Sequence, residues 1–173
     1  MKSTNIIALL TITMLSLNAT KAEEVIRKVE NVTILNLNGE EAQIPYWGEK
    51  NLMLFYVDPD RANQNQNYTD ELERSKRAEG ENLVGMGIMN LKDAPFIPNR
   101  LARAMANKRT EKNHAIVLSD EGRILATEWE LGDCNNKFVS ILVNRDGEIV
   151  YLKKGEFTPE EWEEFLLAID TLK

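Results

Sequence analysis

Four polar residues that follow a continuous apolar run are the first candidates for chemistry. Asp58, Asp60, Arg61 and Asn63 come directly after Leu52–Val57 (LMLFYV). Such a run predicts a strand buried on both faces, and open α/β sheets place their binding crevices at the carboxyl ends of these strands. The four side chains therefore indicate a polar recognition site. The alternatives are a solvated loop whose side chains cap the next helix, and a metal or acid–base site.

The spacing of the two aspartates also suits a calcium ligand pair. Asp58-Pro59-Asp60 is an Asp-x-Asp sequence, but the segment lacks the glycine and the closing glutamate of an EF-hand loop. We therefore expect neither a metal nor another cofactor.

Cys134 is the second candidate and the only cysteine of the chain, in the loop Leu131–Asn136 (LGDCNN). A single cysteine excludes an intramolecular disulfide, a CxxC redox pair and a Cys-rich zinc site. A reactive thiol usually lies beside a cation or a helix N-terminus that lowers its pKa. Cys134 instead adjoins Asp133, which raises the thiol pKa, while Lys137 is three residues away. The sequence favours an unreactive thiol, with a one-thiol, peroxide-linked enzyme as the alternative.

The single histidine and a basic segment complete the candidates. His114 precedes the apolar residues Ala115–Leu118 and has no neighbour that resembles a triad partner, so we expect a structural histidine at a strand edge. The basic segment comprises Arg100, Arg103, Lys108, Arg109 and Lys112. On an acidic protein such a segment is typical of a solvated helix face. The alternative is a site for a small anionic ligand, a lipid headgroup or an acidic partner surface.

Composition and charge limit the function classes. The chain has 173 residues, of which 43% are hydrophobic and 28% charged, as expected for one globular domain. Its 21 Lys and Arg residues against 28 Asp and Glu residues give a net charge of −7. This acidic balance argues against binding to nucleic acid.

The N-terminal residues are typical of a secretory signal. Lys2 supplies a positive start, Ile6–Leu17 is an uncharged and mostly apolar run, and Ala19–Ala22 offers small residues for cleavage. A transmembrane anchor needs about 20 apolar residues, more than this run provides. We therefore expect residues 1–22 to be a cleaved signal peptide and residues 23–173 to be a single periplasmic domain. Cleavage would leave 19 cations against 28 acids, a net charge of −9.

The order of apolar runs predicts an α/β fold with a central sheet. The predicted strands are Val32–Leu37, Leu52–Val57, Leu83–Met89, His114–Leu118, Phe138–Val143 and Glu148–Leu152. The predicted helices lie near Tyr68–Glu79, over Asn99–Lys108 and after Thr158.

Three parts of this pattern are more specific. The turn Asn144–Gly147 joins the last two strands in a β-hairpin, and Thr158 and Glu161 form a capping box for the final helix. In the middle helix, Leu101, Ala104 and Met105 share one face. We expect Tyr151, Trp129 and Trp162 in the core.

Three motifs resemble the thioredoxin-like fold of exported TlpA/ResA-type thiol oxidoreductases. Asn38–Glu41 resembles the turn after their first strand, Gly48–Tyr56 their GKxxLxxFW, and Ile141–Gly155 their FLIDxDGxIVxxxxG. The resemblance implies a thioredoxin-like α/β fold, with a central mixed β-sheet flanked by helices and a C-terminal β-hairpin plus helix. It also places Asp60 and Asn63 at the positions of the CxxC cysteines. Dithiol exchange needs one thiolate to attack and a second thiol to resolve the mixed disulfide, and these residues can do neither.

A narrower resemblance is to the YtfJ-like family of bacterial periplasmic thioredoxin-fold proteins, which also lack CxxC. It is carried by the loop Asp93–Pro98 (DAPFIP), the paired blocks Ala115–Trp129 and Lys137–Glu161, and the phrase DGxxxxxxxGxxTPEE in Asp146–Glu161. The resemblance implies the periplasm and supplies no catalytic residues. Phe138 stands where the redox relatives have a cis-proline.

These observations favour a protein-binding module of the cell envelope over an enzyme. We expect an unknown protein partner, no nucleic acid, and no transmembrane anchor after signal cleavage. Two alternatives remain open: a single-cysteine thiol or peroxide-linked enzyme that uses Cys134, and a binder of a small anionic ligand.

Overall fold

The computed structural model describes residues 27–78, 80–94 and 96–173, except for the side chains of residues 109, 112 and 113. The predicted signal peptide, residues 1–22, lies outside the described residues.

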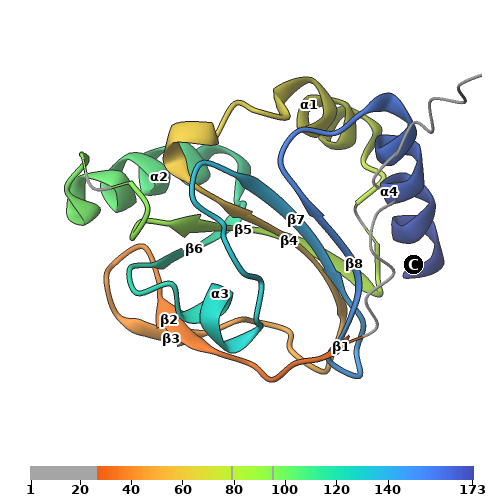
Figure 1. The fold of residues 1–173 in the computed structure, drawn as a ribbon, viewed down its shortest axis with the longest axis horizontal. Coiled ribbons are helices and arrows are strands. Elements are labelled where there is room, and N and C mark those ends of the chain that lie inside the picture. The colour runs from red at the N-terminus through yellow and green to blue at the C-terminus, as the bar shows by residue number, and fades with distance from the viewer. Residues whose placement is uncertain (1–26, 79, 95) are drawn as a thin grey trace, which may run out of the picture.

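An eight-stranded mixed sheet forms the middle of the molecule (Figure 1). The strands are β1 (Arg27–Lys28), β2 (Thr33–Leu35), β3 (Glu41–Gln43), β4 (Asn51–Val57), β5 (Leu83–Asn90), β6 (Ile116–Asp120), β7 (Phe138–Val143) and β8 (Glu148–Lys154). Their order across the sheet is β1-β8-β7-β4-β5-β6-β2-β3. Strand β4 is parallel to β5 and antiparallel to β7, and β5 is parallel to β6.

Strand β4 lies inside the sheet because its side chains are apolar on both faces. Leu54 and Tyr56 are fully buried in the core cluster below the sheet in Figure 1, whereas Met53 belongs to a second cluster above it. The sequence prediction of a strand buried on both faces is confirmed.

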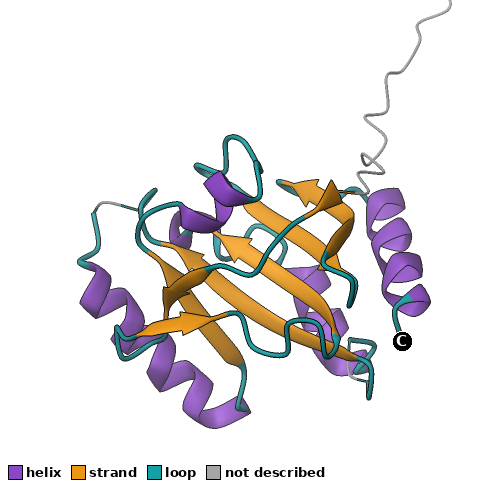
Figure 2. Cartoon of the chain, turned by 90° about the horizontal axis from the view of Figure 1, so that it is seen from below, coloured by secondary structure: helices purple, strands orange, loops and turns teal. Residues whose placement is uncertain are grey.

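Helices cover the two faces of the sheet unequally (Figures 1 and 2). The helices are the short 3-10 helix η1 (Pro59–Arg61), α1 (Gln66–Ser75), α2 (Asn99–Asn113), α3 (Ile124–Glu128) and α4 (Pro159–Thr171). Helices α1, α2 and α4 lie on one face, and the short α3 lies on the other, toward which the β2–β3 edge of the sheet curls. Leu72 of α1 and Trp162 of α4 share one core cluster, and Leu125 of α3 belongs to the other.

The predicted C-terminal hairpin and helix are present. Strands β7 and β8 pair in antiparallel register, as expected from the turn between them. The Thr158 hydroxyl accepts a hydrogen bond from the Glu161 main-chain N–H at 3.2 Å, and the Glu161 carboxylate accepts one from the Thr158 N–H at 2.9 Å. This reciprocal pair is the predicted capping box. Trp129, Trp162 and Tyr151 are buried, as predicted.

The face of helix α2 that Leu101, Ala104 and Met105 share is turned away from the sheet. Leu101 and Met105 are about half exposed, at 53% and 50%, while Ala102 is buried. Ala104 is exposed as well, so the side of the helix that carries Ala102 and the half-buried Ala106 faces the sheet.

The predicted position of His114 is wrong. This residue does not open a strand. It ends α2 as an exposed cap in the left-handed conformation, with φ of 56°, and β6 begins only at Ile116. The helix therefore runs to Asn113, five residues beyond its predicted end at Lys108.

Candidate functional site

Asp58 is a structural residue of the loop after β4. Its side chain is completely buried. One carboxylate oxygen accepts the N–H of Asp60 at 2.9 Å, and the other accepts the N–H of Asn136, 78 residues away, at 2.8 Å. The Asp58 N–H itself donates to the carbonyl of Lys137 at 3.1 Å. Asp58 thus caps η1, as the capping alternative expects, although it is buried and not solvated. It also fastens the loop after β4 to the loop before β7.

The other three residues of the predicted recognition site remain at the surface. Asp60, Arg61 and Asn63 are exposed and lie together around the turn that η1 begins. Asn63 also lines the larger groove described below, whereas Asp60 and Arg61 do not. The structure therefore brings three of the four predicted side chains to one surface and places the fourth beneath them.

Phe138 is the first residue of β7 and is buried. Its ring contacts that of Phe55, with 5.1 Å between centroids. Its main-chain N–H donates to the side-chain oxygen of Gln64 at 3.0 Å, a second link between the loops after β4 and before β7. Every peptide bond in the described parts of the chain is trans.

Cys134 is buried, with 3% of its surface exposed. The pKa of its thiol is raised to about 11, chiefly by burial; Lys154 and Lys137 oppose this rise, and Asp133 and Asp93 add to it. The thiol donates only a weak hydrogen bond, at 3.6 Å, to the carbonyl of Gly132. At neutral pH the sulfur is therefore a protonated core atom, which disfavours nucleophilic chemistry.

A second buried acid, Asp120, ends strand β6 beside the site. Its carboxylate accepts the main-chain N–H groups of Gly122, Ile124 and Leu125 and the hydroxyl of Tyr56, the last at 3.2 Å. Burial and this acid raise the pKa of Tyr56 far above its ordinary range. The three N–H contacts fix the start of α3, and the fourth gives the buried Tyr56 hydroxyl an acceptor. Asp120 and Tyr56 are therefore a structural pair.

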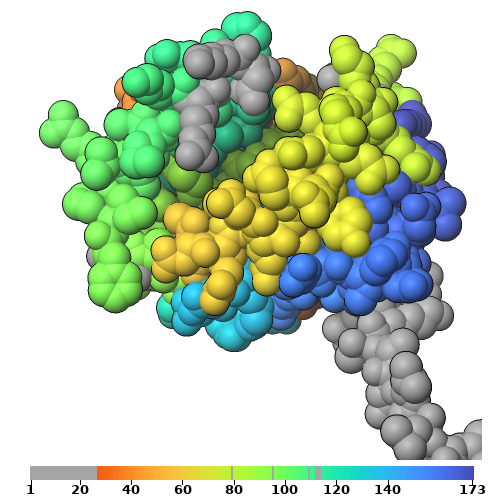
Figure 3. Space-filling view, turned by 90° about the horizontal axis from the view of Figure 1, so that it is seen from above, coloured from red at the N-terminus to blue at the C-terminus, as the bar shows by residue number. Residues whose placement is uncertain are grey.

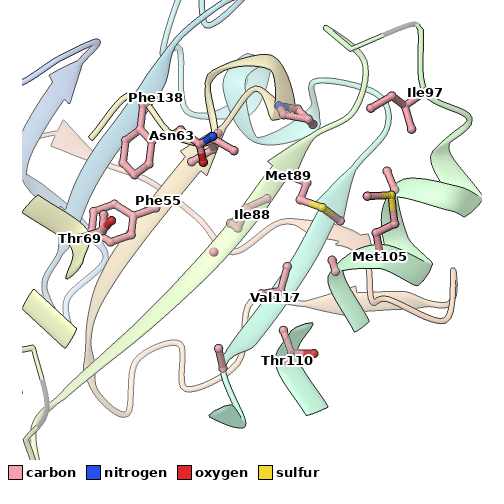
Figure 4. A pocket seen from close by; sticks show the side chains of 17 residues that line it. Phe55, Asn63, Thr69, Ile88, Met89, Ile97, Met105, Thr110, Val117 and Phe138 are labelled. Carbon is pink, nitrogen blue, oxygen red and sulfur yellow. The ribbon is translucent and has the colours of Figure 1, made fainter. Parts of the chain in front are cut away.

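An apolar groove of about 560 Å³ lies between α1 and α2. Its floor is the sheet, and space-filling atoms show this face hollowed between the two helices (Figure 3). Lining residues from six different elements include Phe55, Thr69, Met89, Met105, Val117 and Phe138. Met89 of β5 and Met105 of α2 point toward one another across the opening (Figure 4).

Gly87 explains part of the depth of this groove. It lies in the middle of β5 on the groove floor, between the partly exposed side chains of Phe55 and Val117. A Cβ atom built there would meet only a methyl of Val117, at 3.7 Å, which is an ordinary contact. The missing side chain therefore leaves space in the groove that no other residue fills.

The basic segment does not form one site. Arg103 is paired with Glu121 and its guanidinium packs against Gly39 of the β2–β3 turn. Arg100 and Lys108 are exposed on α2. The side chains of residues 109 and 112 lie outside the described part of the chain.

No three His, Cys, Asp or Glu side chains within residues 27–78, 80–94 and 96–173 come together in a group that can hold a metal ion. In the same ranges, none of the helices has the length and apolar character needed to cross a bilayer.

Apart from Asn63, the groove residues were missed by sequence reasoning, which followed polar side chains. Most of the lining is apolar and is typical of ordinary core residues when read along the sequence. The available signal was the alternation Gly85-Met86-Gly87 within a predicted strand, because glycine in a strand marks a face without side chains.

Comparison with solved structures confirms the fold class. The chain resembles a DsbF homologue from Corynebacterium diphtheriae with a TM-score of 0.62 and 14% identity, over 88% of this chain and 90% of that one. For a thiol-disulfide oxidoreductase from Bacteroides fragilis the TM-score is 0.56 and the identity 14%, with coverages of 83% and 99%. For the exposed lipoprotein thioredoxin of Streptococcus pneumoniae they are 0.53 and 12%, with coverages of 80% and 99%.

At these identities the likeness establishes the thioredoxin-like fold alone. The sequence matches no protein-family model, and no curated protein sequence matches it.

Proposed function

We propose that this chain is an exported thioredoxin-fold protein of the YtfJ-like type that does not exchange disulfides and that holds a segment of a partner protein of the cell envelope. The groove between α1 and α2 is the binding site in this proposal. The observation that carries it is an open apolar groove of about 560 Å³ beside the exposed turn of Asp60 and Arg61, with Asn63 in the lining of both.

The character of the groove supports a protein partner. Its lining is mainly apolar, with Asn63, Thr69 and Thr110 among the few polar side chains. A mostly apolar concave surface with a few polar groups is the usual form of a binding site. Methionines such as Met89 and Met105 adapt their shape, which suits a surface that receives another chain.

The sulfur chemistry supports a role without redox turnover. Asp60 and Asn63 carry no sulfur, and the one thiol of the chain is buried with a raised pKa. Thiol–disulfide exchange needs an accessible thiolate, which this site does not offer.

The test is to fill the groove without disturbing the sheet. Gly87→Val adds a branched side chain at a floor position that has room for Cβ, in a strand that favours β-branched residues. The tagged chain and this variant are cross-linked in the native envelope and their neighbours are captured. We expect a discrete partner with the wild type and its loss with Gly87→Val.

Gly85→Ala is the matched control. It changes the same strand two residues away, outside the groove lining, where the added Cβ displaces only the flexible end of Met53. Capture of the same partner by wild type, Gly85→Ala and Gly87→Val alike would refute the groove as the binding site. An Asp60/Arg61/Asn63 triple-alanine variant then shows whether the adjacent turn holds the partner instead.

A further inference from the structure

Helix α2 and the loop before it carry apolar side chains that project into solvent. Phe96 is 90% exposed, and Leu101 and Met105, one helical turn apart, are 53% and 50% exposed. They are three of the six large apolar side chains that are exposed among the described residues. The start of α2 lies at the opposite end of the molecule from α4 and the C-terminus (Figures 1 and 2).

Unpaired cations lie among these apolar side chains. Arg100 precedes Leu101, and Lys108 follows Met105 by about one turn; both are exposed and form no ion pair within the described parts of the chain. The sequence of α2 contains five cations and a single acid, Glu111, although acids outnumber cations in the whole chain by 28 to 21. Positive charge is therefore concentrated on this helix.

We propose that the α2 end of the molecule, defined by Phe96, Arg100, Leu101, Met105 and Lys108, docks on a lipid surface that carries anionic headgroups. The side chains of Phe96 and Leu101 enter the boundary between headgroups and acyl chains, Met105 lies at the edge of this surface beside the groove, and the two cations lie at the level of the headgroups. This combination of projecting apolar groups and cations is the physical basis of interfacial membrane binding.

A lipid surface fits this end better than the other occupants. An anionic small molecule would pair with Arg100 or Lys108 but would leave Phe96 and Leu101 exposed. A peptide held in the groove contacts Met105 on its inner side, whereas Leu101 and Phe96 lie outside the groove lining. A lipid bilayer offers partners to both kinds of side chain, because its anionic headgroups pair with the cations and its acyl chains bury the apolar groups.

The test is sedimentation of the protein with lipid vesicles, using the chain in the form recovered from cells so that every variant has the same N-terminus. Vesicles of phosphatidylcholine alone are compared with vesicles of equal parts phosphatidylcholine and phosphatidylglycerol. We expect binding to the anionic vesicles that weakens as salt is added. Arg100→Gln should lower it about fivefold, since one cation near an anionic surface contributes about that factor. Leu101→Gln should lower it about tenfold or more, the value of burying one leucine side chain.

The same kinds of substitution at other exposed sites show whether a loss of vesicle binding is specific to the α2 end. Arg61→Gln removes an exposed arginine, and Leu167→Gln an exposed helical leucine, at sites outside the α2 end. Both controls should bind the anionic vesicles as the wild type does.

Three outcomes would overturn the proposal. They are no binding to anionic vesicles, equal binding to the two vesicle types, and equal loss in the control variants. A further result would also overturn the proposal: the wild type binds no vesicles, and Leu101→Gln no longer captures a protein that the wild type captures by cross-linking. The α2 end would then be assigned to a protein partner.

Discussion

Asp58 shows how a single residue can be mistaken for a ligand when its neighbours are known only by type. Asp58 and Asp60 are two positions apart in a polar loop, and nothing in the sequence separates them. The structure buries the first and exposes the second, because the first meets the N–H of Asn136 from a segment 78 residues away. A partner so distant in the chain cannot be inferred from local spacing.

The burial of Asp58 predicts an asymmetric result for two similar substitutions. Asp58→Ala leaves two main-chain N–H groups without their acceptor and should lower the free energy of unfolding by about 1–3 kcal/mol. Asp60→Ala removes an exposed carboxylate and should change it by no more than about 0.5 kcal/mol. Urea unfolding followed by circular dichroism measures both. Equal effects would contradict the structural role of Asp58.

Cys134 provides a prediction about pH. Its pKa is raised to about 11 in the folded chain, while an unfolded cysteine has a pKa of about 8.5. Between these values the unfolded chain has lost the thiol proton and the folded chain retains it, so stability falls as pH rises. The contribution is fully present below about pH 8.5 and is lost progressively up to about pH 11.

The measurement compares the wild type with Cys134→Ala at two pH values. Between about pH 8 and pH 9.5 the wild type should lose about 1 kcal/mol more unfolding free energy than the variant, which has no thiol to titrate. A thiol reagent should also react slowly with the folded wild type and rapidly in urea. Fast reaction in the folded state would revive the one-thiol enzyme as an alternative.

At the scale of elements, the helices that could be predicted correctly are those with local sequence signals such as caps. Helix α4 has a capping box, a proline at its first position and a clear apolar face, and the structure begins it at Pro159 after Thr158 as expected. Helix α2 has no side-chain cap, and its apolar residues permit two faces. Which face turns inward depends on how closely the helix approaches the sheet, and this is a tertiary property. The groove beside it was unpredictable for the same reason.

The capping box predicts a local stability effect. Thr158→Ala removes the acceptor of the Glu161 N–H and should lower the free energy of unfolding by about 1 kcal/mol. Thr171→Ala makes the same change at the other end of α4, where the hydroxyl only donates to the Ala168 carbonyl within the helix. It should have an effect below about 0.5 kcal/mol. Urea unfolding of the two variants side by side checks the difference.

At the scale of the whole molecule, one sheet joins two separate apolar cores. Trp129 belongs to the core on the α3 face, where it packs against Trp47 with 5.7 Å between ring centroids. Trp162 belongs to the core on the α4 face, where its ring is 5.5 Å from that of Phe165. Strand β4 contributes buried side chains to both cores. Loss of β4 from the sheet would therefore expose the two cores together.

This arrangement predicts a single cooperative unfolding transition, as expected for one domain. Trp162→Phe leaves the tryptophans of the α3 face as fluorescence probes, and Trp47→Phe/Trp129→Phe leaves only that of the α4 face. In each variant, the urea midpoint from fluorescence should coincide with that from far-ultraviolet circular dichroism, which reports the whole sheet. Comparison within each variant removes the effect of the substitution on stability. A fluorescence midpoint that differs from the circular dichroism midpoint in either variant would mean that one face unfolds on its own, and the two cores would then be separate cooperative units on a shared sheet.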